Sequence, residues 1–166
     1  MRLYIVRHAI AAARGTPGLA DDERPLTEEG VTKMKKAAPA LARIGAIPDL
    51  ILTSPLVRAR QTAEIIQKAL GGKTPLRATQ ALSPSGTREA IYDEIRRNAK
   101  SEALMLVGHQ PSLGELAGAL AWGSPEHYVE LKKGGMCALD LEQLSPVPRG
   151  TLLFLLTPSI LRELAG

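Results

Sequence analysis

The chain has 166 residues, of which 45% are hydrophobic and 23% charged, a composition typical of one folded domain and unlike that of a disordered segment. The formal net charge of +4 is spread along the chain and aromatic residues make up only 3%, which argues against nucleic acid as a partner. The single cysteine, Cys137, excludes an internal disulfide, and no apolar run is long enough to span a membrane. We therefore expect residues 1–166 to form a single soluble domain in the cytoplasm.

Short apolar runs alternate with longer segments of helical periodicity, the order typical of a parallel sheet covered by helices. Strands are predicted at residues 3–6, 50–52, 76–78, 104–107, 137–141 and 152–156. Helices are predicted at residues 28–44, from residue 54 to about 70, at about 87–98, from residue 111, and at 159–164. Pro39 should kink the first helix, and Ser54 with Pro55 should open the second as its N-cap and first residue. This pattern predicts an α/β fold.

Basic and imidazole side chains follow several of the predicted strands. Arg7 and His8 end the first strand, Arg58 lies early in the helix after the second, and His109 follows the strand at 104–107. Because ligands bind beyond the carboxyl ends of strands in an open parallel sheet, we expect these residues to meet in one pocket.

Such a pocket suits phosphoryl transfer, because arginine forks bind phosphate oxygens and a neutral histidine can attack phosphorus. His8 would form a phosphohistidine that water hydrolyses, and His109 would donate a hydrogen bond to the phosphoryl group. Since arginines supply the positive charge, neither a metal nor a cofactor is predicted. The same placement also fits a module that binds phosphate without turnover.

Four segments resemble, in order, motifs of the histidine phosphatase superfamily, which includes the phosphoglycerate mutases. They are residues 3–9, ending in Arg-His-Ala; 25–30, Pro-Leu-Thr-Glu-Glu-Gly; 53–63, containing Ser-Pro-Leu-Val-Arg-Ala-Arg-Gln-Thr-Ala; and 107–111, Val-Gly-His-Gln-Pro. The resemblance implies that His8 is the phosphate acceptor and His109 the second active-site histidine. Arg7 and Arg58, rather than Arg60, are the implied phosphate ligands. The implied fold is a three-layer α/β sandwich, phosphoglycerate mutase-like, with a mostly parallel central sheet flanked by helices.

Within the superfamily, the short chain and the stretches at 24–27 and 82–86 are most similar to the SixA-type phosphohistidine phosphatases. This similarity implies a signalling protein carrying phosphohistidine as substrate, and inorganic phosphate as product. Two positions depart from the family pattern. Ala9 replaces a glycine, so its backbone must suit a residue with a Cβ. Residues 82–86 stand where the mutase-like branches carry a glutamate that donates a proton.

The missing glutamate favours a phosphoramidate substrate, because an imidazole leaving group can already carry a proton whereas an alkoxide needs one. The alternative is a proton donor from elsewhere, namely Asp21, Asp22, Glu23, Glu89 or water. Arg24 is a candidate for a further phosphate or protein contact, with a surface ion pair as the alternative. Two other functions stay open: a phosphatase of small phosphomonoesters, and a phosphate-recognition module.

Overall fold

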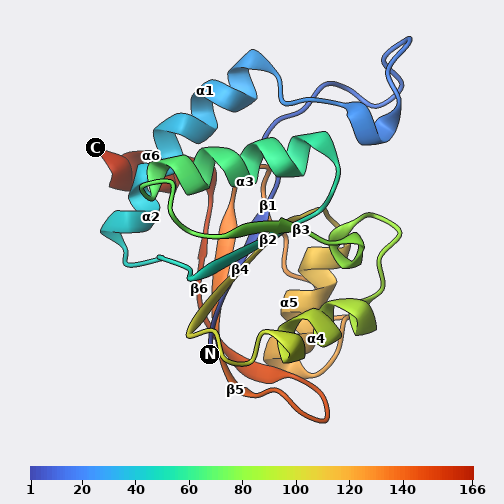
Figure 1. The fold of residues 1–166 in the computed structure, drawn as a ribbon, viewed down its shortest axis with the longest axis vertical. Helices are drawn as coiled ribbons and strands as arrows, with labels where there is room; N and C mark the ends of the chain where they lie inside the picture. The colour runs from blue at the N-terminus through green and yellow to red at the C-terminus, as the bar shows by residue number, and fades with distance from the viewer.

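A single six-stranded sheet forms the centre of the computed structural model, which describes residues 1–166 (Figure 1). Its strands are β1 (Arg2–Arg7), β2 (Leu50–Thr53), β3 (Leu76–Ala78), β4 (Ala103–Gly108), β5 (Met136–Gln143) and β6 (Arg149–Leu156). They lie in the order β3-β2-β4-β1-β5-β6, and only β5 runs antiparallel to its neighbours. All six predicted strands and the mostly parallel sheet are confirmed.

Helices cover both faces of this sheet (Figure 1). They are α1 (Glu28–Ala37), α2 (Pro39–Arg43), α3 (Val57–Ala69), α4 (Arg88–Arg97), α5 (Ser112–Trp122) and α6 (Pro158–Ala165), with short 3-10 turns η1 (Asp21–Glu23) and η2 (Gln80–Leu82). Two clusters of 19 buried residues each fill the space between the sheet and α4 with α5, and between the sheet and α1, α2, α3 and α6. Because one buried cluster lies on each face, the sheet is the middle of three layers. No helix has the length and apolar character needed to cross a bilayer.

Two helix boundaries follow from single residues. Pro39 divides the predicted helix at 28–44 into α1 and α2, because it begins α2 and offers no backbone donor. The predicted helix start at Ser54 is wrong, since α3 begins only at Val57. The Ser54 N–H instead continues the sheet by donating to the Val107 carbonyl (2.9 Å), and its hydroxyl accepts from the Leu56 N–H (3.3 Å).

The carboxyl ends of three neighbouring strands meet at one edge of the sheet. Arg7 of β1 lies opposite Gly108 of β4, and Thr53 of β2 lies opposite Val107. The residues that follow these strands therefore emerge side by side, beneath the long loop that joins β1 to α1 and projects beyond the sheet (Figure 1).

Candidate active site

A pocket of about 250 Å³ lies at the carboxyl ends of β1, β2 and β4, and it brings together Arg7, His8, Arg58 and His109. The other residues that line it are Ala11, Ala12, Ala13, Arg14, Arg24, Pro84, Gln110 and Lys133. The lining residues include five cationic side chains and no carboxylate. A concave site with charge of one sign attracts anions, so the pocket is suited to a phosphoryl group.

His8 follows β1 directly and is only 7% exposed. Its Nδ1 lies 2.7 Å from the carbonyl oxygen of Ala9. A carbonyl oxygen can only accept a hydrogen bond, so we assign the proton of the neutral ring to Nδ1, which leaves a lone pair on Nε2. Burial, reinforced by the charge of Arg58, lowers the pKa of His8 to about 4. The imidazole is therefore neutral near pH 7 and chemically able to act as a nucleophile.

Two residues of the motif around Arg58 brace the backbone beside His8. The Thr62 hydroxyl accepts from the Ala9 N–H (3.0 Å) and donates to the Arg58 carbonyl (2.7 Å). Gln61 Oε1 accepts from the N–H of Leu26 (2.7 Å). Sequence reasoning did not assign these roles, although both residues stand in the Gln-Thr pair of the motif. Ala9 in place of glycine introduces no strain, because no residue other than glycine has a positive φ.

The start of α1 holds the loop that follows the nucleophile. Thr27 caps α1, and its N–H donates to the Ile10 carbonyl (3.0 Å). A Cβ at Gly30 would overlap that same carbonyl oxygen. Glycine is required at this position for the close approach, so the Pro-Leu-Thr-Glu-Glu-Gly segment fixes the course of the chain just beyond His8.

Asp21, in η1, holds two of the guanidinium groups. Arg58 donates through Nη1 to the Asp21 carbonyl (2.7 Å), and its Nη2 lies 3.4 Å from the Asp21 carboxylate. Arg24 donates to the same carboxylate through Nε (3.0 Å) and to the Ala12 carbonyl through Nη1 (2.6 Å). Arg24 is 8% exposed and lines the pocket, and it forms an ion pair with the half-exposed carboxylate of Asp21. Asp21 does not line the pocket and braces the arginines from behind.

Two arginines that line the pocket each keep one buried donor without a partner in the protein. Arg7 donates through Nη1 to the Leu131 carbonyl (2.8 Å), but its buried Nε has no partner. The Nε of Arg58 is likewise buried and unpaired. Burial without a hydrogen-bond partner is costly for such a donor, so the two guanidinium groups are held beside the pocket at an energetic cost.

His109 lies beside His8, with the two ring centroids 5.2 Å apart. Its Nε2 is 2.8 Å from the Ser54 hydroxyl, and its Nδ1 is buried without a partner. Burial, together with the neighbouring His8 and Arg58, lowers the pKa of His109 to about 3, so this ring is also neutral. Ser54 is a site residue that sequence reasoning assigned to a helix cap instead.

No acidic residue takes the place of the missing glutamate. Pro84 lines the pocket in the stretch where the mutase-like branches carry that acid, and the exposed side chains of Asp22, Glu23 and Glu89 lie outside it. Burial acts to raise the pKa of Asp21, but the hydrogen bond from Arg24 and the charge of Arg58 outweigh it, so the pKa is lowered. A carboxyl group of lowered pKa that does not line the pocket is poorly suited to donate a proton there.

The fold and the pocket define a three-layer α/β protein with a neutral histidine among arginines. Comparison with known proteins identifies the family to which such a protein belongs. A family model of the histidine phosphatase superfamily (branch 1) matches residues 3–84. An uncharacterised protein of Picosynechococcus sp. is 45% identical over 141 residues, 84% of each chain. Phosphohistidine phosphatase SixA of Escherichia coli is 27% identical over 125 residues, 74% of this chain and 76% of SixA. The chain belongs to the histidine phosphatase superfamily, and the resemblance in its motifs is confirmed.

Solved structures share the whole architecture. The protein histidine phosphatase SixA complexed with tungstate superimposes with a TM-score of 0.84 at 23% identity, over 97% of this chain and 99% of that one. The alpha-ribazole phosphatase from Shigella flexneri superimposes with a TM-score of 0.73 at 20% identity, over 95% and 97% of the two chains. These matches confirm the predicted phosphoglycerate mutase-like fold, which is common to phosphatases of different substrates.

Proposed function

We infer that this hydrolase of the histidine phosphatase superfamily removes phosphate from phosphohistidine in a cytoplasmic signalling protein, through a phosphohistidine intermediate on His8. One observation carries the inference: a buried, neutral His8 faces an arginine-rich pocket that no carboxylate lines. The sequence similarity to SixA of Escherichia coli supports the same substrate class.

The proposed reaction has two steps. Nε2 of His8 attacks phosphorus, a new P–N bond forms, and the P–N bond to the substrate imidazole breaks with its electron pair going to the departing nitrogen. A water molecule then attacks the phosphorus on His8, and the P–N bond breaks with its electron pair returning to Nε2. Both protons of the water leave with the phosphate as dihydrogen phosphate, and His8 is again neutral with its proton on Nδ1. Arg7, Arg24 and Arg58 hold the phosphoryl oxygens in both steps, and His109 supplies a further polar contact.

The leaving group explains why the site can work without an acid. A phosphorylated imidazole whose other nitrogen carries the ring proton departs as a neutral molecule. An alcohol departing from a phosphomonoester would need a proton at the bridging oxygen. Pro84 lines the pocket in the stretch where that donor is expected, and proline has no side-chain proton to donate. The pocket therefore favours phosphoramidates over phosphomonoesters.

A side-by-side assay tests this substrate class. We expect kcat/KM for a phosphohistidine peptide to exceed that for sugar phosphates and phosphoserine by about 100-fold or more, a difference of about 3 kcal/mol in the barrier. Glu89→Gln, which changes an exposed carboxylate outside the pocket, should leave both activities unchanged. A higher kcat/KM for a phosphomonoester, or loss of activity in Glu89→Gln, would establish the phosphomonoester alternative instead.

His8→Ala separates catalysis from simple phosphate recognition. This variant should lose turnover and the acid-labile phosphoenzyme by about 1,000-fold or more, while inorganic phosphate still binds to the arginines. Rapid quench with radiolabelled substrate measures the phosphoenzyme. Hydrolysis at the wild-type rate by His8→Ala would show that another residue is the nucleophile.

A further inference from the structure

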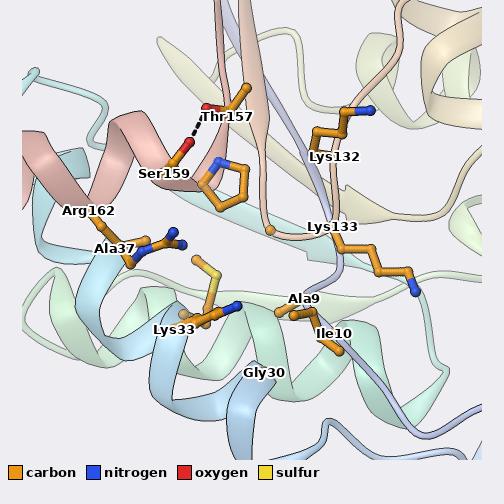
Figure 2. A pocket seen from close by; sticks show the side chains of 13 residues that line it. Ala9, Ile10, Gly30, Lys33, Ala37, Lys132, Lys133, Thr157, Ser159 and Arg162 are labelled. Carbon is orange, nitrogen blue, oxygen red and sulfur yellow. Dashed lines mark hydrogen bonds between the residues drawn. The ribbon is translucent and has the colours of Figure 1, made fainter.

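A second pocket, of about 320 Å³, lies next to the active site, between α1, the segment before β5 and the start of α6 (Figure 2). Four cationic side chains line it, those of Lys33, Lys132, Lys133 and Arg162, and no carboxylate does. Figure 2 shows Lys33 and Arg162 together on one side and Lys132 and Lys133 on the other. The cations thus come from three separate segments and surround one space.

Two of these cations are free to bind a ligand. Lys33 pairs with Glu29 and Lys132 with Glu130 (2.6 Å). Neither Lys133 nor Arg162 has a hydrogen-bond acceptor or an acidic partner in the structure. Both residues line the pocket from opposite sides, and with no carboxylate in the lining the pocket has an excess of positive charge.

The pocket also has an apolar part. Met34 and Ala37 of α1 are buried and line it together with Pro158. The combination of an apolar wall and cationic rim suits a ligand with a short aliphatic stem and a carboxylate end, as in a glutamate side chain.

A shared wall joins this pocket to the active site. Lys133 lines both pockets, and the consecutive residues His8 and Ala9 line the active site and the second pocket respectively. The N–H of Gly134 lies 3.1 Å from the carbonyl oxygens of both Arg7 and His8, so it anchors the segment that bears Lys133 to the nucleophile. Residues that flank a phosphohistidine bound in the first pocket are therefore within reach of the second.

We propose that the second pocket binds an acidic side chain that neighbours the phosphohistidine in a protein substrate. This assignment rests on the proposed phosphohistidine phosphatase activity and adds to it the local sequence that the enzyme prefers. The carboxylate pairs with Arg162, and the stem of the acidic side chain contacts Met34.

Two phosphohistidine peptides that differ only in their flanking residues provide the test. One carries glutamate on both sides of the phosphohistidine and the other carries glutamine, and phosphoramidate serves as a substrate too small to span both pockets. We expect the wild type to show about a fivefold lower KM for the glutamate peptide, the effect of roughly one partly exposed ion pair. Arg162→Glu should remove or reverse this preference and leave the hydrolysis of phosphoramidate unchanged.

Lys73→Glu is the matched control, because it makes the same change of charge at an exposed position that lines neither pocket. It should keep the preference for glutamate. Arg162→Gln, compared with the wild type in thermal unfolding, guards against a folding defect and should lower the preference without reversing it.

The outcomes separate the two proposals. Equal KM values for the two peptides in the wild type, or a preference that survives in Arg162→Glu, would overturn the assignment of the second pocket while leaving phosphohistidine hydrolysis intact. Failure to hydrolyse either peptide, with sugar phosphates turned over, would overturn the proposed function and this assignment together.

Discussion

Nε2 of His109 lies 2.8 Å from the hydroxyl of Ser54, and both side chains are buried. The serine is itself held at the end of β2, where its N–H donates to Val107 in β4. The orientation of the His109 ring therefore depends on a hydrogen bond between two strand ends and is set before any substrate binds.

Ser54→Ala should lower kcat/KM by about tenfold, because loss of one buried hydrogen bond costs about 1–3 kcal/mol and frees the His109 ring to turn. Steady-state kinetics on a phosphohistidine peptide measures the loss. Ser54 acts through His109, so the double variant Ser54→Ala/His109→Gln should be no slower than His109→Gln alone. Additive losses in the double variant would show that Ser54 acts elsewhere.

The two histidines should make the fold sensitive to acid. Their folded-state pKa values of about 4 for His8 and about 3 for His109 lie below the ordinary 6.5. Between pH 6.5 and pH 4 the histidines of the unfolded chain bind protons that those of the folded chain do not. The free energy of unfolding is therefore highest above pH 6.5 and falls as the pH drops towards 4. For His8 alone the loss is on the order of 3 kcal/mol.

Thermal unfolding at pH 7.5 and pH 5 measures this effect. The wild type should lose more stability between the two values than His8→Gln does, because the variant no longer has this titrating group. An equal fall in both proteins would show that His8 is not held neutral in the folded state.

Asp21→Ala should raise KM by about fivefold with little change in kcat, because Arg58 and Arg24 lose the carboxylate that positions them. Asp21→Asn keeps one side-chain oxygen as an acceptor and should have a smaller effect. The KM for phosphoramidate and the inhibition constant of inorganic phosphate report the change. A large loss of kcat in both variants, confined to phosphomonoesters, would instead identify Asp21 as a proton donor.

Gly30→Ala should destabilise the protein by about 1–3 kcal/mol, because the added Cβ overlaps the Ile10 carbonyl and one of the two segments must move. The kcat should also fall, since Ile10 lies two residues beyond His8. Thermal unfolding and kinetics measure both losses. Thr32→Ala, on the exposed face of the same helix, should change neither, and equal effects of the two substitutions would contradict the role of Gly30.

Much of this site could be predicted because its main residues follow strand ends. Arg7, His8 and His109 stand directly at or after buried apolar runs, and the parallel order of the sheet brings such positions together. Ser54 was misassigned because Ser-Pro is a common helix start, and only the pairing of β2 with β4 shows that its backbone stays in the sheet. The preference of Ser-Pro for a helix start is overridden by the backbone hydrogen bond between Ser54 and Val107.

Other features could not be read from periodicity. Lys133 reaches the pocket from an irregular segment before β5, for which no pattern predicts a direction. The bracing of Arg58 and Arg24 by Asp21 likewise depends on the course of a long loop. These roles arise from contacts between residues far apart in the chain, and sequence spacing carries little information about them.

The position of β1 inside the sheet affects the order in which the protein can fold during its synthesis. The strand that precedes His8 is synthesised before the other strands of the sheet, yet its two neighbours are β4, at Ala103–Gly108, and β5, at Met136–Gln143. During synthesis, β1 therefore cannot pair on both sides until the chain has been made as far as β5. The pocket around His8 should therefore form late in folding, after β4 and β5 have paired with β1 on its two sides.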